Sequence, residues 1–187
     1  MIRRLSATHS VLLVVDMQAS LMPVINQASE RTAAVARLVQ AAKLLDIPVL
    51  ATEHLADKIG HTVEPLRADL QAVCHKTHFD GTKEAGFEAF MPAGRPQVVM
   101  VGAEAHVCVM QTALGVLQSG REVWMATDGC GSRHDEDRQL GLDRLSRAGA
   151  ELVSTEMVMF EWLVHAHHPQ FRGVLAAIKS KDHKGNH

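Results

Sequence analysis

The sequence predicts an α/β fold of three layers, in which a doubly wound, mostly parallel sheet carries helices on both faces. Short apolar runs rich in β-branched residues recur along the chain, as is typical of strands buried on both sides. Stretches with helical spacing separate these runs, and this alternation indicates parallel strands joined by crossover helices. A chain of 187 residues can bury one sizeable core. We therefore predict a single domain over residues 1–180, followed by a polar tail over 181–187.

The individual elements follow from local patterns. Apolar runs predict strands over 11–15, 48–52, 71–75, 97–102, 122–127 and 151–154, of which 71–75 is the weakest. Apolar residues at helical spacing predict helices over 30–45, 107–118, 135–148, 157–165 and 170–179. Gly120 and Gly149 follow two of these helices as C-terminal caps, and Pro169 separates the last two.

Composition and charge narrow the function. Hydrophobic residues make up 47% of the chain and charged residues 21%, which is typical of a globular protein. A net charge of −2 without a long basic run argues against nucleic acid or membrane partners. The chain has three cysteines, an odd and small number that argues against a framework of disulfide bonds. We therefore expect a reducing, cytoplasmic setting. No apolar stretch reaches the ~20 residues that span a bilayer.

Three reactive side chains fall at the carboxyl ends of predicted strands, where open parallel sheets bind their ligands. Asp16 follows the first strand and is a candidate base, although a turn aspartate would look the same. Lys76 follows the third and could stabilise negative charge, although a solvated surface lysine is the simpler interpretation. Cys108 lies at the start of a predicted helix, whose dipole would lower the pKa of the thiol. Alternatively, the cysteine is a small apolar residue that packs the helix onto the sheet.

Six segments, in order along nearly the whole chain, resemble the isochorismatase-like cysteine hydrolases. The resemblance is strongest to the branch called isochorismatase-domain-containing proteins. The first three segments carry the signature residues: Val11-Leu-Leu-Val-Val-Asp-Met-Gln18, His75-Lys-Thr-His-Phe79 and Val101-Gly-Ala-Glu-Ala-His-Val-Cys-Val-Met-Gln-Thr-Ala113. The others are Asp128-Gly-Cys-Gly-Ser-Arg133, Ser154-Thr-Glu-Met-Val-Met-Phe-Glu161 and Ala166-His-His-Pro-Gln-Phe171.

The resemblance implies a Rossmann-like sheet and a catalytic triad of Asp16, Lys76 and Cys108. In such enzymes the aspartate takes the thiol proton, the thiolate attacks a carbonyl, and water hydrolyses the resulting thioester. By position, a non-proline cis peptide falls at Ala103–Glu104, and the N–H groups of Glu104 and Cys108 form an oxyanion hole. Because the cysteine is present, small amide or carbamoyl-type C–N substrates are favoured over the vinyl ether that other members cleave.

Further residues are expected around the substrate. The resemblance and the position of these side chains near the same sheet edge make four of them candidate substrate contacts: Gln18, His54, Phe79 and His106. A Cys–His pair between His106 and Cys108 is not expected, because residues at i and i+2 on a helix do not face each other.

A metal site is an alternative near the second strand, where nicotinamidase-type relatives bind a divalent ion. His54, Asp57 and His61 offer suitable ligands for zinc. The Asp-x-His that begins the family's metal motif is absent, because Ala51, Thr52 and Glu53 precede the histidine. We therefore expect no cofactor.

Two non-hydrolase functions stay open at this point. The chain could be an oligomeric binding module of the same fold with an unused triad, or a redox-sensing protein in which Cys108 pairs with Cys74 or Cys130. The family implies a homo-oligomer in either case.

Overall fold

A computed structural model describes residues 3–180, so the predicted tail at 181–187 lies outside the described residues. Its centre is a six-stranded parallel sheet with the strand order β3-β2-β1-β4-β5-β6. The strands are β1 (Ser10–Val15), β2 (Val49–His54), β3 (Ala72–Lys76), β4 (Gln97–Ala103), β5 (Glu122–Gly131) and β6 (Glu151–Val153). All six predicted strands are present, and the α/β fold class is confirmed.

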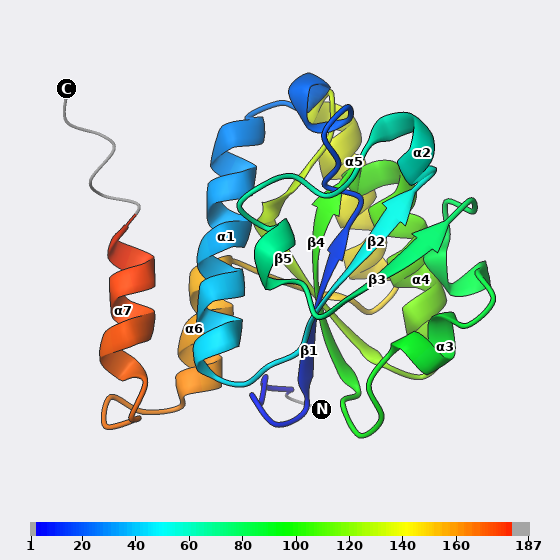
Figure 1. The fold of residues 1–187 in the computed structure, drawn as a ribbon. Coiled ribbons are helices and arrows are strands. Elements are labelled where there is room, and N and C mark those ends of the chain that lie inside the picture. Colours follow the sequence, from blue (N-terminus) through cyan, green and yellow to red (C-terminus); the bar gives the residue numbers. More distant parts are fainter. Residues whose placement is uncertain (1–2, 181–187) are drawn as a thin grey trace, which may run out of the picture.

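Helices cover both faces of this sheet (Figure 1). One face carries α1 (Ala28–Leu44), α6 (Thr155–Leu163) and α7 (Phe171–Lys179), and the other carries α3 (Phe87–Phe90), α4 (Met110–Gln118) and α5 (Asp135–Arg147). Alternate residues of β1 enter the two cores, Leu12 and Val14 on one side and Leu13 and Val15 on the other. This double burial explains why the strand reads as an unbroken apolar run.

Short helices complete the connections between the strands. α2 (Ala56–Ile59) follows β2, and three 3₁₀ turns cover η1 (Met22–Val24), η2 (Arg67–Asp69) and η3 (Gly81–Lys83). Among residues 3–180, no helix has both the length and the apolar character needed to cross a membrane.

The strand order places a switch point between β1 and β4. From β1 the chain adds β2 and β3 toward one edge, and from β4 it adds β5 and β6 toward the other. The connections after β1 and β4 therefore diverge to opposite faces and leave a crevice at their carboxyl ends. Asp16 follows β1 and Glu104 follows β4, so the predicted site lies at this crevice.

Two boundaries differ from the prediction. The residues before α4 form a π-helical turn, η4 (Ala105–Val109), so the helix predicted from Val107 begins as a wider coil. β5 includes Cys130 and runs to Gly131, four residues beyond the predicted strand end at 127. Both extensions lie beside the crevice, where polar and glycine-rich sequence obscures the local pattern.

Candidate active site

The structure brings Asp16, Lys76 and Cys108 together from the carboxyl ends of three strands: Asp16 follows β1, Lys76 ends β3, and Cys108 lies in the π-helical turn after β4. All three residues are buried, although Cys108 keeps 8% of its surface exposed. Sequence reasoning placed each of them at a strand end but could not show that they meet.

Asp16 is held at two points by the neighbouring strand. It has a positive φ of 51°, a left-handed conformation that aspartate tolerates better than most residues. Its backbone N–H donates to the carbonyl oxygen of Thr52 at 3.1 Å, and the Thr52 hydroxyl donates to Asp16 Oδ1 at 2.6 Å. Both residues are fully buried. The carboxylate therefore has a defined orientation.

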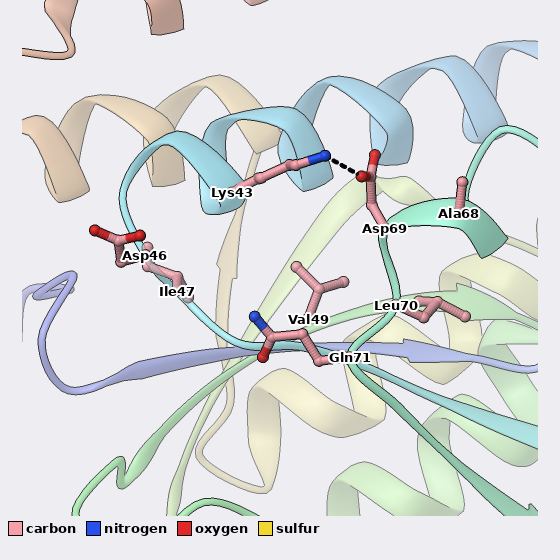
Figure 2. Close-up of a pocket in the computed structure, with 8 residues that line it drawn as sticks. All are labelled: Lys43, Asp46, Ile47, Val49, Ala68, Asp69, Leu70 and Gln71. Carbon is pink, nitrogen blue, oxygen red and sulfur yellow. Dashed lines mark hydrogen bonds and ion pairs between the residues drawn. The ribbon is translucent and has the colours of Figure 1, made fainter.

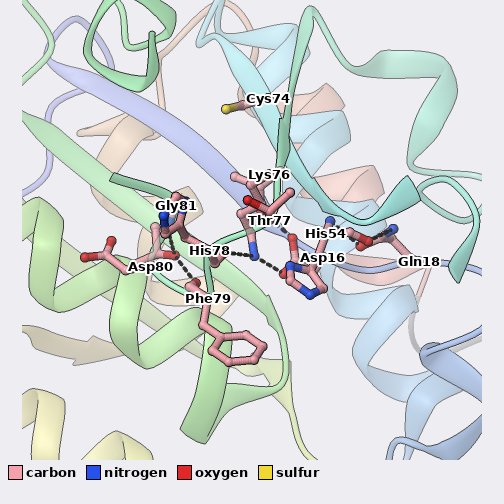
Figure 3. A network of polar contacts seen from close by, with 12 residues as sticks. Asp16, Gln18, His54, Cys74, Lys76, Thr77, His78, Phe79, Asp80 and Gly81 are labelled. Carbon is pink, nitrogen blue, oxygen red and sulfur yellow. Dashed lines mark hydrogen bonds and ion pairs between the residues drawn. The ribbon is translucent and has the colours of Figure 1, made fainter. Parts of the chain in front are cut away.

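Lys76 forms a buried ion pair with Asp16. Its Nζ lies 2.6 Å from Asp16 Oδ2, and the two side chains are 0% and 1% exposed. The same ammonium donates to the carbonyl oxygen of His78 at 3.2 Å. Figure 3 shows this network, with the Cys74 sulfur pointing away from it. The two opposite charges are thus buried away from water, where removal of either one would leave the other without a counter-charge.

The loop after β3, which supplies the His78 carbonyl, is fastened at both ends. The Glu84 carboxylate accepts hydrogen bonds from the backbone N–H groups of Thr77 and His78 at 2.6 and 2.8 Å. These bonds lower the pKa of Glu84 to about 2. Farther along, the buried Thr112 hydroxyl of α4 accepts from the Gly81 N–H and donates to the Phe79 carbonyl.

Cys108 lies in the π-helical turn and is a thiol rather than a thiolate at neutral pH. Burial, followed by the negative charge of Asp16, raises its pKa to about 12, while Lys76 acts in the opposite direction. The predicted lowering of this pKa by the helix dipole is therefore wrong, because desolvation and a neighbouring carboxylate outweigh it.

A cis peptide at Ala103–Glu104 precedes this turn, at the bond that the resemblance implied. Gly102, just before it, has a φ of 138°, and a Cβ atom there would lie 2.1 Å from the Val15 carbonyl oxygen. Only glycine fits such a close approach. Within residues 3–180 the Glu104 N–H donates no hydrogen bond, and its carboxylate accepts from the backbone N–H and Nε of Arg133.

Gln18 and His54 form a fixed rim at the ends of β1 and β2. The buried Gln18 amide accepts from the His54 N–H at 2.8 Å and donates to the carbonyl oxygens of His54 and Gly60. The amide therefore positions the backbone around His54. The His54 ring stacks on Phe79 with ring centroids 5.4 Å apart, and burial together with Lys76 lowers its pKa. A neutral imidazole is the result.

His106 lies in the same π-helical turn as Cys108, two residues before it. Its Nδ1 is 2.9 Å from the hydroxyl oxygen of Ser132, which is buried at the end of β5, and its Nε2 is 3.9 Å from an oxygen of Asp137. These contacts direct the ring toward β5 and α5, in agreement with the expectation that it does not pair with the cysteine.

His54, Asp57 and His61, the ligands of the alternative metal site, do not form a group placed to hold a metal ion. His61 Nδ1 lies 2.9 Å from an oxygen of the buried Glu53, and the same oxygen is 3.5 Å from His75 Nδ1. The Thr62 N–H and hydroxyl donate to the other Glu53 oxygen. Among residues 3–180, no three histidine, cysteine, aspartate or glutamate side chains are placed to hold a metal ion. Glu53 serves instead as a clamp on the loop after β2.

Two shallow hollows of about 330 Å³ each open on the surface of the described residues, and one of them touches the triad. The first is at the opposite, amino end of β2, beside the Lys43–Asp69 ion pair (Figure 2). The second lies at the carboxyl ends of β2 and β3, where it is lined by Lys76 of the triad together with Leu55, Ala56, Asp57, His75, Thr77 and Glu84.

Sequence reasoning missed the supporting residues of this site, chiefly Thr52, Thr112, Ser132 and Arg133. Ser132 and Arg133 belong to a segment that carries the family resemblance, but nothing in their spacing indicates a contact with the connection after β4. Thr52 faces Asp16 only because β2 pairs with β1 in one register, Val15 opposite Thr52. The sequence does not encode that register in any local pattern.

Comparisons with known proteins agree with this architecture. Residues 10–157 match the isochorismatase domain family. A zebrafish (Danio rerio) isochorismatase domain-containing protein 2 is 37% identical over 174 residues, which cover 92% of this chain and 88% of that protein.

Solved structures are also similar. One described as MAR1 ribonuclease from Caenorhabditis elegans has a TM-score of 0.88 and 31% identity, covering 94% of this chain and 92% of that one. The Escherichia coli YcaC gene product, described as an octameric hydrolase of unknown specificity, has a TM-score of 0.83 and 23% identity, covering 97% and 98% of the two chains. The matched domain spans most of the sequence and includes all three residues of the site, and we conclude that this chain belongs to the isochorismatase family.

Proposed function

We propose that this protein is a cysteine hydrolase that cleaves a small amide or carbamoyl-type C–N bond through a thioester intermediate. The observation that carries the proposal is the buried Lys76–Asp16 ion pair beside the Cys108 thiol. A desolvated charge pair costs several kcal/mol to maintain unless its surroundings compensate for it, and a reactive cysteine next to it supplies a reason for keeping it.

Asp16 is the proposed base and Cys108 the nucleophile. As the sulfur bonds to the substrate carbonyl carbon, Asp16 takes the thiol proton and the carbonyl electron pair moves onto its oxygen. When the C–N bond breaks, Asp16 returns the proton to the departing nitrogen. Water, deprotonated by Asp16, then attacks the thioester, releases the acid and restores the thiol.

The remaining residues stabilise and orient these steps. The free N–H of Glu104 and the N–H of Cys108 are the proposed donors to the developing oxyanion, and the Arg133–Glu104 bonds fix the first of them. Lys76 compensates the charge of Asp16. His54, Phe79 and His106 are proposed to line the substrate, whereas the Gln18 amide acts through His54.

A homo-oligomer is part of the proposal. Three exposed apolar residues, Met157, Phe160 and Val164, follow one another along α6 and its end, and they are 50%, 43% and 78% exposed. Such a stripe is typical of an interface between subunits. The octamer described for the YcaC product supports association in this fold. The three free cysteines support a reducing, cytoplasmic setting.

The test is a panel of small amides, carbamoyl compounds and ureides, with an RNA oligonucleotide included because one similar structure is described as a ribonuclease. We expect turnover of a small C–N substrate by the wild type and none by Cys108→Ala, with an acyl adduct on Cys108 detected by peptide mass spectrometry after acid quenching. Cys130→Ala is the matched control and should keep its activity.

Each competing function predicts a different outcome. RNA cleavage that survives Cys108→Ala would contradict the hydrolase mechanism. Reversible sulfenic acid or disulfide formation without any turnover would favour the redox sensor. Tight binding of a small molecule that is never cleaved would favour the binding module.

A further inference from the structure

The two oxygens of the Asp16 carboxylate have different partners, and this asymmetry has a chemical consequence. Oδ1 accepts from the Thr52 hydroxyl at 2.6 Å, whereas Oδ2 lies 2.6 Å from Lys76 Nζ. We propose, on the basis of the function proposed above, that Thr52 is a positioning residue that occupies Oδ1 and reserves Oδ2 to receive the proton of Cys108.

Thr52 is suited to this role by its place in β2. The strand register pairs Thr52 with Val15. The Thr52 carbonyl oxygen and hydroxyl therefore both form hydrogen bonds with Asp16, the residue after Val15. The side chain is fully buried, and within residues 3–180 its hydroxyl makes this single hydrogen bond. The hydroxyl has one proton to donate, and Asp16 Oδ1 is its one acceptor among these residues. It therefore keeps donating to Oδ1 while the carboxylate is ionised.

Oδ2 is left open to the thiol. Lys76 balances its charge, but this contact does not have hydrogen-bond geometry, and among residues 3–180 no regular hydrogen bond reaches this buried oxygen. The ammonium directs a hydrogen bond to the His78 carbonyl instead. The Cys108 thiol interacts with both Asp16 and Lys76. Oδ1 is occupied by the Thr52 hydroxyl, so Oδ2 is the carboxylate oxygen whose lone pairs no hydrogen bond among residues 3–180 uses, and we assign the S–H proton to it.

The consequence for the reaction concerns one proton. When the sulfur bonds to an electrophilic carbon, the S–H proton moves to Oδ2 and the electron pair of the broken S–H bond forms the new S–C bond. A proton on Oδ1 would force the Thr52 hydroxyl to rotate away, and that hydroxyl donates to nothing else among the described residues. Thr52 thus makes one of the two carboxylate oxygens the working base.

The test measures alkylation of Cys108 by iodoacetamide at pH 7, with the rate for each cysteine read by peptide mass spectrometry. Thr52→Val keeps the shape of the side chain but removes the hydroxyl, and Thr52→Ser keeps the hydroxyl. Loss of a hydrogen bond to a charged group corresponds to a decrease of about tenfold in rate. We therefore expect Thr52→Val to slow the alkylation of Cys108 about tenfold and Thr52→Ser to leave it at the wild-type rate. Cys74 is the internal control and should not change.

The same substitution in an Asp16→Asn background separates positioning from a general loss of structure. If Thr52 acts through the carboxylate, Thr52→Val should have no further effect on Cys108 there. Thr52→Ala repeats the test with a smaller side chain and should behave like Val. A Cys108 rate unchanged in Thr52→Val, or slowed equally in both backgrounds, would overturn the proposal.

The controls also distinguish this proposal from the hydrolase function on which it rests. If Asp16→Asn alters the pH profile of Cys108 alkylation and Thr52→Val leaves the wild-type rate, the triad stands and the role of Thr52 is rejected. If Asp16→Asn itself changes nothing, the triad is rejected and the role of Thr52 with it.

Discussion

Cys108 and Cys130 are two buried thiols on the same side of the molecule with very different surroundings. Burial is the main cause that raises the pKa of each to about 12. Cys130, inside β5, is fully buried, and its sulfur faces the backbone carbonyls of Met100 and Ala126. Cys108, in the π-helical turn, keeps a narrow opening to solvent and interacts with Asp16 and Lys76.

The comparison shows that the pKa of a thiol does not identify a nucleophile. Burial raises the pKa of both thiols, but only Cys108 lies beside a carboxylate that we propose as its base, and of the two only Cys108 keeps part of its surface exposed. Access and a base within reach distinguish a catalytic thiol from a structural one. Each of the following predictions changes one of these differences.

The largest effect is expected from the two cysteines themselves. Cys108→Ala should abolish hydrolysis, a loss of at least about a thousandfold, because the covalent step is removed. Cys130→Ala should leave the rate near that of the wild type and cost about 1 kcal/mol of stability through the small cavity it creates. Turnover and urea unfolding measured on both variants test this contrast. Loss of activity in both would remove the distinction between the thiols.

The ion pair beside Cys108 provides the second contrast. Lys76→Met leaves Asp16 buried without a counter-charge, and we expect the free energy of unfolding to fall by about 3–5 kcal/mol. Lys43, 68% exposed and paired with Asp69, is the matched control, and Lys43→Met should cost less than about 1 kcal/mol. Chemical denaturation of the two variants gives both values. Equal losses would mean that the Lys76 pair is not held in a dry environment.

The third contrast concerns the backbone at Gly102, six residues before Cys108, and a second glycine with a positive φ elsewhere in the chain. Gly102→Ala brings a Cβ within 2.1 Å of the Val15 carbonyl oxygen and should cost about 3 kcal/mol or more. Gly149 also has a positive φ, but a Cβ there meets nothing within 4 Å, so Gly149→Ala should cost about 1 kcal/mol. Thermal unfolding of the two variants should preserve this order. A Gly102→Ala protein as stable as Gly149→Ala would contradict the close approach.

The smallest effect concerns the loop that supports Lys76. Glu84 has a pKa lowered from 4.5 to about 2 by its hydrogen bonds to Thr77 and His78, so the folded state resists its protonation. Its contribution to stability is therefore complete above about pH 4.5 and is lost as the pH falls from there toward 2. Glu84→Gln should flatten the fall in unfolding free energy between pH 5 and 3. The same slope in both proteins would exclude this clamp.

Much of the fold follows from the sequence because its strands are buried on both faces and read as apolar runs. Val11 to Val15 could be assigned without any alignment, since both cores require apolar side chains there. The end of β5 could not, because Asp128 to Gly131 looks like a turn and extends as a strand only through its pairing with β4. Pairing between distant segments leaves no local periodic signal.

The same distinction between local pattern and distant pairing applies to the site. Asp16, Lys76 and Cys108 could be proposed because each follows a strand, and the family resemblance joined them. The pKa of Cys108 was predicted in the wrong direction, because the helix dipole is visible in the sequence while burial and the nearby Asp16 charge are not. Thr52 could not be found, since its role depends on a strand register.

The central claim is that Asp16 serves as the base for the Cys108 thiol, and the pH dependence of cysteine alkylation tests it most directly. Iodoacetamide rates for Cys108 and Cys74 should be measured from pH 6 to 10 in the wild type and in Asp16→Asn. An ordinary thiol reacts about tenfold faster per pH unit below its pKa, as we expect for Cys74. Cys108 should instead react at a nearly constant rate, since the carboxylate takes the proton as the sulfur attacks, and Asp16→Asn should restore a titrating profile. A Cys108 rate that rises with pH like that of Cys74 in both proteins would contradict the account.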